Sequence, residues 1–121
     1  MDYGDGSAPN PEGQMGAYAI QSATSLHGQL APIFPSLSAA QRWALVGVTP
    51  MIGQNDAPSE RFYVTDAQQL RTEARAKGYG RLAMWSADRD KACPGGPQPY
   101  ASPTCSSINQ SAWAFSHVFA A

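Results

Sequence analysis

The sequence has 121 residues, of which 43% are hydrophobic and 14% are charged, and its formal net charge is −1. A chain of this length forms at most one domain, and its near-neutral charge gives no electrostatic reason to expect nucleic acid or an acidic membrane as a partner. No apolar stretch approaches the roughly 18 residues of a membrane span, and no basic and apolar leader follows Met1, so no signal peptide is expected in this chain.

The first third of the chain predicts the end of a strand, a loop and a long helix. Residues 1–3 have the character of a strand tail, and residues 4–13 form a polar loop rich in glycine and proline. From Met15 to Phe34, apolar residues recur on one helical face, which predicts an amphipathic helix. Gly28 and Pro32 are expected to weaken its last turns.

The next segment predicts a short helical turn followed by a buried strand. Ser38 and Gln41 have the spacing of a capping box. The run Trp43–Ile52 is almost continuously apolar and does not alternate, which favours a strand buried on both faces, as in a parallel sheet. Pro50 near its end is compatible with a strand terminus or a bulge.

A second helix and a third strand follow. Thr65 and Gln68 have capping-box spacing, and Gly78 stands where a C-cap glycine is expected. The inner stripe of this helix is formed by Ala67, Leu70 and Ala74. Residues Arg81–Trp85 then predict a short strand.

The C-terminal part predicts a constrained loop and a closing helix. Cys93 and Cys105 bracket a segment that contains four prolines and two glycines. Such a loop gains from a covalent tie, so a disulfide is predicted, with two free thiols as the alternative. A disulfide would mean that the parent protein is secreted. Apolar residues at helical spacing over residues 112–119 indicate the last helix.

Alternating strands and helices are typical of βα units in a parallel sheet. An open doubly wound sheet and a (β/α)₈ barrel both fit this order, but no Gly-x-Gly-x-x-Gly or phosphate loop follows any strand, which removes support for nucleotide binding. The fold class predicted from the residues is therefore α/β, with both arrangements still open, and a (β/α)₈ TIM barrel would be a partial one over residues 1–121. Three strands cannot close a barrel of eight, so two sheet edges are expected to lie open.

Polar and aromatic side chains follow each predicted strand at its carboxyl end, where barrels gather their functional groups. They are Asp2, Tyr3, Gln54, Asn55, Asp56, Trp85, Ser86, Asp88, Arg89 and Asp90. Aromatic rings cover the apolar face of a pyranose, and amides and carboxylates bind its hydroxyls, so this set predicts a carbohydrate cleft. The structural alternatives are that Asp2 caps its loop, that Tyr3 packs in the core, and that residues 88–90 form a local salt-bridged turn.

These strand ends resemble, in order, those of bacterial family 18 glycoside hydrolases, the chitinases. Met1–Asp5 is similar to the end of the sixth barrel strand, Val48–Asp56 to the seventh, and Gly80–Ser86 with residues 88–90 to the eighth. The resemblance implies that the partial barrel holds the equivalents of strands 6–8 with their helices. It also implies that the parent protein hydrolyses β-1,4-linked N-acetylglucosamine polymers and needs no cofactor.

In this family the N-acetyl oxygen of the sugar attacks its own anomeric carbon while a glutamic acid protonates the leaving oxygen. That glutamate closes a D-x-x-D-x-D-x-E motif, which is absent from this sequence, so the chain's own status as an enzyme stays open. The resemblance assigns Asp2 to holding the reacting sugar and its acetamido group, and Tyr3 to orienting the N-acetyl oxygen. The usual tyrosine precedes the acid, where this chain has Met1.

The resemblance assigns sugar binding to four further residues. Trp85 matches the floor of the subsite where the bond is cut, and Met51, Gln54 and Asn55 are expected to contact the substrate. The implied partner is therefore chitin or a chito-oligosaccharide. Two histidines and two cysteines scattered over the chain do not make a metal site.

Three functional hypotheses follow. The chain is part of a chitinase-like hydrolase that lacks the catalytic acid motif, or a non-catalytic chitin-binding or interaction protein, or a weak hydrolase assembled on oligomerisation. The open apolar flanks of a partial barrel predict a homo-oligomer, a complementary fragment, or a chain that is only marginally stable alone.

Overall fold

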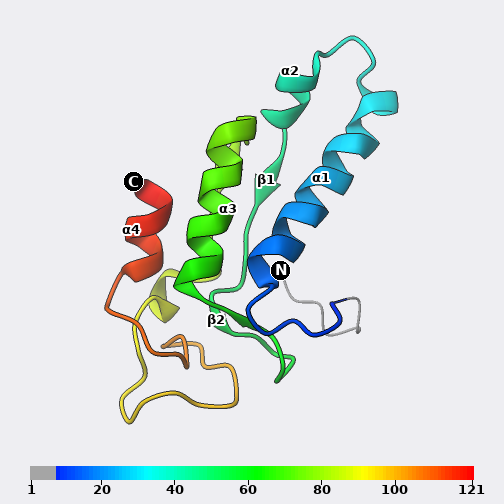
Figure 1. Ribbon diagram of the computed structural model, residues 1–121. Coiled ribbons are helices and arrows are strands. Elements are labelled where there is room, and N and C mark those ends of the chain that lie inside the picture. Colours follow the sequence, from blue (N-terminus) through cyan, green and yellow to red (C-terminus); the bar gives the residue numbers. More distant parts are fainter. Residues whose placement is uncertain (1–7) are drawn as a thin grey trace.

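The computed structural model describes residues 8–121, so the predicted strand tail with Asp2 and Tyr3 lies outside the described residues. The elements are α1 (Met15–Ile33), α2 (Ala39–Trp43), β1 (Gly47–Val48), β2 (Gly53–Gln54), β3 (Arg61–Phe62), α3 (Val64–Lys77), β4 (Arg81–Leu82), the 3₁₀ turn η1 (Ala87–Arg89) and α4 (Ala114–Ala120). Helices α1, α3 and α4 stand in a row with α3 in the middle, as Figure 1 shows. No helix within residues 8–121 combines the length and the hydropathy of a membrane span.

The second and third predicted strands, which contain β1 and β4, pair in parallel as expected. Gly47 lies opposite Arg81 and Val48 opposite Leu82, and three residues further along each strand a parallel bridge joins Met51 to Trp85. The carboxyl ends of β1 and β4 therefore lie side by side, which is the arrangement that the candidate site requires.

Helix α1 confirms the predicted span to within one residue, and Pro32 is contained in its last turn. Its first half is buried at Met15, Ala19 and Ala23, whereas Ile33 near its end is 63% exposed. The amphipathic stripe is thus buried in the first half of the helix and only partly covered further on, where Leu30 packs against the core.

The prediction of one strand over residues 43–52, buried on both faces, is wrong. Trp43 ends α2, and the extended segment after it alternates between exposed and buried positions: Leu45 is 52% exposed, whereas Val46 is fully buried. Gly47 and Thr49 are exposed and Val48 is buried, so the helices cover one face of the strand and the other face is open in this chain. The capping box of Ser38 and Gln41 is confirmed, with both reciprocal hydrogen bonds formed.

We call the extended residues 45–52, which contain β1, the β1 segment. An antiparallel hairpin of β2 and β3, which the sequence did not predict, follows it. Gly53 lies opposite Phe62 and Gln54 opposite Arg61. Gly53 has φ of +72°, and a Cβ there would lie 2.1 Å from the carbonyl oxygen of Ser106. Glycine is therefore required for the chain to turn into the hairpin while the C-terminal loop passes against it.

Helix α3 begins differently from the prediction. The residue that caps its first turn is Asp66, whose carboxylate accepts hydrogen bonds from the backbone N–H groups of Tyr63 at 2.8 Å and Gly16 at 2.9 Å. The carboxylate of Asp66 thus replaces the expected Thr65 and Gln68 pair and also ties α1 to α3. The C-terminal end is as predicted, with Gly78 in the left-handed conformation.

The closing helix α4 and the disulfide between Cys93 and Cys105 are confirmed, and no cysteine is free. Phe115 of α4 is fully buried, while Ala112 lies before the helix. The core gathers Met15, Ala19, Ala23, Val46, Val48, Ile52, Phe62, Ala67, Leu70, Ile108 and Phe115.

Candidate functional site

A hollow of about 350 Å³ lies where the carboxyl ends of the two parallel strands meet the disulfide loop. Its lining consists of Met51, Asp56, Trp85, Ser86, Arg89, Ala101, Ser102 and Pro103. We call it the Trp85 hollow. Its floor comes from the two strand ends, and one wall, the segment Ala101–Pro103, comes from the loop between the two cysteines.

Sheet register places Met51 and Trp85 next to each other. The backbone N–H of Ile52 donates to the carbonyl of Trp85 at 3.0 Å, and that of Trp85 donates to the carbonyl of Pro50 at 2.9 Å. Paired residues of parallel strands point to the same face, so both side chains project from the open face of the sheet. Trp85 is 64% exposed and joins Ser86 through a cis peptide bond. A broad aromatic surface is therefore presented in the hollow without a covering side chain.

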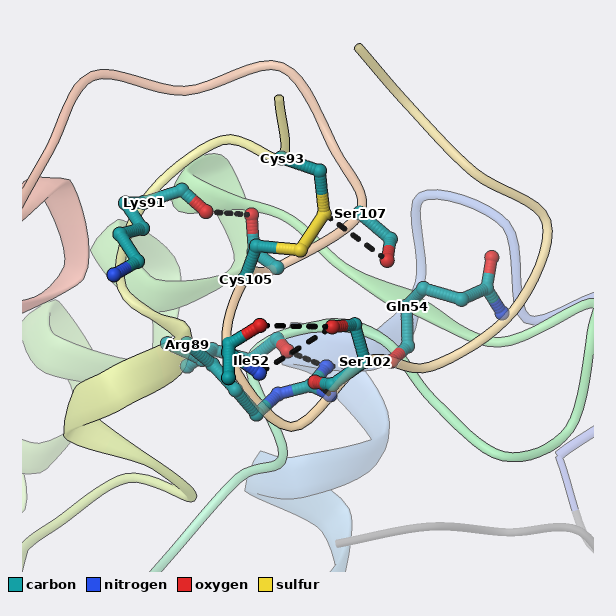
Figure 2. The surroundings of a disulfide bond; sticks show 10 residues. Ile52, Gln54, Arg89, Lys91, Cys93, Ser102, Cys105 and Ser107 are labelled. Atoms are coloured by element: carbon teal, nitrogen blue, oxygen red, sulfur yellow. Dashed lines mark hydrogen bonds between the residues drawn. A yellow bond between two sulfur atoms is a disulfide. The ribbon is translucent and has the colours of Figure 1, made fainter. Parts of the chain in front are cut away.

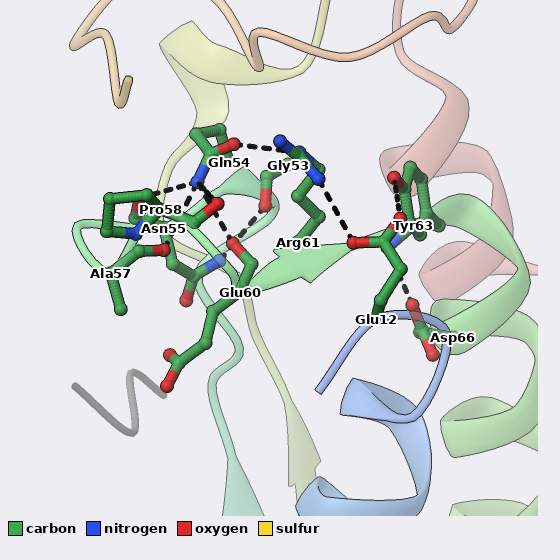
Figure 3. A network of polar contacts seen from close by, with 10 residues as sticks. All are labelled: Glu12, Gly53, Gln54, Asn55, Ala57, Pro58, Glu60, Arg61, Tyr63 and Asp66. Atoms are coloured by element: carbon green, nitrogen blue, oxygen red, sulfur yellow. Dashed lines mark hydrogen bonds and ion pairs between the residues drawn. The ribbon is translucent and has the colours of Figure 1, made fainter. Parts of the chain in front are cut away.

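Gln54 and Asn55 are not exposed in this site, which differs from their predicted contact with substrate. Both are fully buried. The Gln54 Nε2 group donates toward four backbone carbonyls at 3.0–3.2 Å, those of Asn55, Ala57, Pro58 and Glu60 (Figure 3). Asn55 Nδ2 donates to the carbonyls of Met51 and Gly53, each at 3.0 Å. These amides fold the loop that follows β2, because buried carbonyls need donors.

A polar network links the same hairpin to the segment before α1. Arg61 Nε donates to Gln54 Oε1 at 2.9 Å, and its Nη1 pairs with the Glu12 carboxylate at 3.1 Å. The Tyr63 hydroxyl donates to the other Glu12 oxygen at 2.6 Å (Figure 3). Burial, followed by the hydrogen bond and negative charge of Glu12, raises the pKa of Tyr63 above its ordinary value. The network fixes Glu12 away from the Trp85 hollow.

Arg89 does not form the local salt-bridged turn that was considered for residues 88–90. It is only 2% exposed, and its guanidinium donates to three backbone carbonyls: Ile52 at 2.7 Å, Gln54 at 2.6 Å and Ser102 at 2.5 Å (Figure 2). Burial lowers the pKa of Arg89, and the negative charge of Asp56 opposes that shift. Arginine stays protonated at neutral pH, so a buried cation joins the end of the β1 segment to the disulfide loop.

Asp90 is also buried, and it accepts hydrogen bonds from the first turn of α4. Its carboxylate accepts from the backbone N–H groups of Phe115 at 3.1 Å and Ser116 at 2.8 Å, from the Ser116 hydroxyl at 2.7 Å, and from Gln110 Nε2 at 2.8 Å. Burial alone would raise the pKa of Asp90, but the hydrogen bonds from Ser116, Phe115 and Gln110 outweigh it and lower the pKa. The adjacent residues Arg89 and Asp90 therefore anchor different parts of the molecule.

Asp56 is the carboxylate among the residues that line the hollow, and it is exposed. Glu12 is held by Arg61 and Tyr63, Glu60 is 3% exposed on the hairpin, and Glu73 lies on α3. Within residues 8–121, no group of three His, Cys, Asp or Glu side chains is placed to hold a metal ion. The described part of the site is thus equipped to bind a ligand through an aromatic face, hydroxyls and one acid.

Sequence reasoning missed the wall formed by Ala101–Pro103. These residues are small, and no strand end or motif points to them. The two cysteines that bracket the loop were the available signal, because a disulfide holds its ends in place. Which side of the molecule the loop would cover depends on the long-range contact of Arg89 with Ser102.

No protein-family model matches the chain. A curated relative from Escherichia coli K12, named "Probable bifunctional chitinase/lysozyme", is 39% identical over 100 residues, which are 79% of this chain and 11% of that protein. "Endochitinase 11" of the fungus Metarhizium anisopliae is 38% identical over 94 residues, which are 74% of this chain and 18% of that protein.

Solved structures agree with the curated relatives. Active domain 2 of the chitinase from Pyrococcus furiosus superposes with a TM-score of 0.81 and 42% identity, over 87% of this chain and 34% of that one. The same values hold for that domain complexed with chito-oligosaccharides. The chain thus spans about a third of the solved domain and less of the curated relatives. Over most of its own length, the chain is therefore similar to one part of a chitinase catalytic domain.

Proposed function

We propose that this chain supplies the floor and one wall of a cleft that binds chito-oligosaccharides in a chitinase-type glycoside hydrolase. The observation that carries the proposal is the exposed face of Trp85, which lies beside Met51 in the Trp85 hollow. Aromatic rings present a flat apolar surface with polar groups at its margin, which matches a pyranose ring. The similar Pyrococcus furiosus domain was solved with chito-oligosaccharides, which supports the same ligand class here.

The proposal also includes a more detailed fold than the parallel pairing of β1 with β4. We infer that β1 and β4 correspond to the seventh and eighth strands of a partial family 18 barrel, with residues 1–3 as the end of the sixth. In this correspondence Asp2 and Tyr3 keep the roles that the resemblance implies, which are holding the reacting sugar and orienting its N-acetyl oxygen. In this arrangement Gln54 and Asn55 act indirectly, because their amides shape the loop that carries Asp56.

Binding without cleavage is the expected behaviour of the isolated chain. Asp56 is the acid in the described lining of the hollow, and within residues 8–121 no glutamate belongs to that lining. A general acid must lie within hydrogen-bond reach of the leaving oxygen. This observation favours the non-catalytic carbohydrate-binding role for the chain by itself.

The open face of the sheet supports a further part of the proposal. Leu45 and Thr49 are exposed on the same strand face as Met51, in a segment whose sequence is almost continuously apolar. We propose that another polypeptide, either a second copy or a complementary chitinase segment, covers this face. The disulfide supports export of the parent protein, since such bonds persist mainly in oxidising compartments.

The function is tested with a chromogenic chito-oligosaccharide and the purified chain, in parallel with Trp85→Ala. We expect binding by the original chain and no release of the chromophore. Turnover that disappears in Trp85→Ala would instead show catalysis at this hollow and would contradict the non-catalytic role. Absence of binding would contradict the proposal as a whole.

A further inference from the structure

The loop that forms the wall of the Trp85 hollow is held at two places: at its base by a disulfide and hydrogen bonds, and at the wall itself by Arg89. The ends of this loop are fixed by the Cys93–Cys105 disulfide and by Ser106, whose N–H and hydroxyl both donate to the carbonyl of Lys91, at 2.9 and 3.1 Å. The same segment pairs with the hairpin, because the N–H of Gln54 donates to the carbonyl of Ser106 at 2.8 Å. These contacts hold the base of the loop, and the backbone N–H of Gln98 donates to the carbonyl of Ser107 at 3.1 Å. Residues 101–103, which form the wall and which we call the tip, have another anchor.

Arg89 is that anchor. Its Nη1 donates to the carbonyl of Ser102, in the middle of the wall, while its Nη2 donates to the carbonyls of Ile52 and Gln54 (Figure 2). Within residues 8–121, the other hydrogen bonds of Ser102 are local ones to Thr104. The tip is thus joined to the strand end through one buried guanidinium.

We propose that Arg89 is a positioning residue for the sugar-binding hollow, and that the segment Ala101–Pro103 which it holds determines how wide a ligand fits against Trp85. The inference rests on the proposed function and extends it to residues with no assigned role. Arg89 acts through the backbone of Ser102, because its own side chain is almost fully buried.

The chemistry favours arginine for this task. Three carbonyls from two segments converge on one planar group with five N–H donors in a fixed fork. Lysine carries a single ammonium on a flexible stem and cannot hold the three acceptors in the same geometry. Arg89→Lys therefore keeps the charge and removes the clamp.

The test combines two readouts on the intact, oxidised chain. Backbone ¹⁵N order parameters report the rigidity of Ala101, Ser102 and Thr104, and isothermal titration calorimetry with tri-N-acetylchitotriose reports binding. In the original chain we expect order parameters of about 0.8 at the tip, falling below about 0.6 in Arg89→Lys. We also expect binding to weaken by about tenfold or more.

Asp90→Asn is the matched control, since it alters the adjacent buried charge but loosens α4 instead of the loop. Its tip order parameters and affinity are expected to stay close to those of the original chain. A folded Arg89→Lys with a rigid tip and unchanged affinity would overturn the inference. So would order parameters below about 0.6 at the tip of the folded original chain, because the clamp would then hold nothing.

A second variant keeps the test decisive if Arg89→Lys does not fold. Ala101→Leu adds volume to the wall without touching the clamp, so we expect a rigid tip and binding weakened severalfold. Unchanged binding in this variant would overturn the role of the wall. If the original chain does not bind the sugar but Arg89→Lys still loosens the tip, the proposed function fails and the positioning of the loop is supported.

Discussion

Gln54 follows the β1 segment at its carboxyl end, yet its amide points into the hairpin and away from the hollow. Its sequence signal is the same as that of Trp85: a polar or aromatic residue after an apolar run. What separates the two is the backbone turn at Gly53, which carries Gln54 into β2. Sequence position alone could predict which residues follow the strands, but not which of them remain exposed.

Gln54→Leu tests this structural role. The change removes the amide donor from the carbonyls of Asn55 and Pro58 and the acceptor from Arg61 Nε, whereas the carbonyls of Ala57 and Glu60 keep backbone donors. We therefore expect a loss on the order of 3 kcal/mol in the free energy of unfolding. Urea unfolding provides the measurement, and Gln68→Leu on the exposed face of α3 is the control, expected to stay within about 0.5 kcal/mol. Unchanged stability together with lost sugar binding would restore Gln54 as a direct contact.

The lowered pKa of Asp90 predicts that the free energy of unfolding decreases in acid. Its folded pKa is lowered, because the hydrogen bonds from Ser116, Phe115 and Gln110 outweigh the burial that would raise it. A carboxyl with a lowered folded pKa contributes stability above its unfolded value, about 3.9, and loses that contribution as the pH falls through the folded value.

The corresponding experiment follows unfolding between pH 7 and pH 2. Asp90→Asn is expected to be less stable than the original chain at pH 7, by about 1–2 kcal/mol, because its amide nitrogen cannot accept from the N-terminal amides of α4. The difference should shrink as the pH drops below about 4. A difference that is constant over the whole range would contradict the assignment.

At the element scale, local signals predicted helices better than strands. The Ser38 box and Gly78 act within one turn, and both appear as expected. The strand predicted over residues 43–52 is wrong about burial on both faces, because from residue 45 onward its even-numbered positions are buried by contacts with helices from elsewhere in the chain and its odd-numbered positions are exposed or half-buried. The β2–β3 hairpin lacks an Asn-Gly type of turn signal, and its loop is held by the buried amides of Gln54 and Asn55, whose direction the sequence does not indicate.

At the same scale, we predict that a side chain at Gly53 destabilises the contact between the hairpin and the C-terminal loop. Gly53→Ala adds a Cβ 2.1 Å from the carbonyl of Ser106 at a φ of +72°, whereas Gly13 has the same φ with nothing within 4 Å. The Gly13→Ala control therefore measures backbone strain alone, about 1 kcal/mol. We expect Gly53→Ala to cost at least about 2 kcal/mol more by thermal or urea unfolding. Equal losses in the two variants would contradict the close packing of the loop on the hairpin.

At the scale of the whole molecule, the open sheet face predicts association. Light scattering coupled to size-exclusion chromatography should give a mass above the 12.9 kDa of one chain, and Leu45→Glu should reduce it. Leu26→Glu is the control, because Leu26 is exposed on α1 and not on the sheet. A compact, stable particle of 12.9 kDa for the original chain would contradict the need for a cover.

The central claim is that the exposed face of Trp85 is a sugar-binding surface, and calorimetric titration with tri-N-acetylchitotriose tests it most directly. Trp85 is 64% exposed, so Trp85→Ala should leave stability within about 0.5 kcal/mol. Its affinity should fall by about tenfold or more, while Trp113→Ala, which removes a tryptophan outside the hollow, should bind as the original chain does. Equal affinities of the original chain and a folded Trp85→Ala would contradict the account.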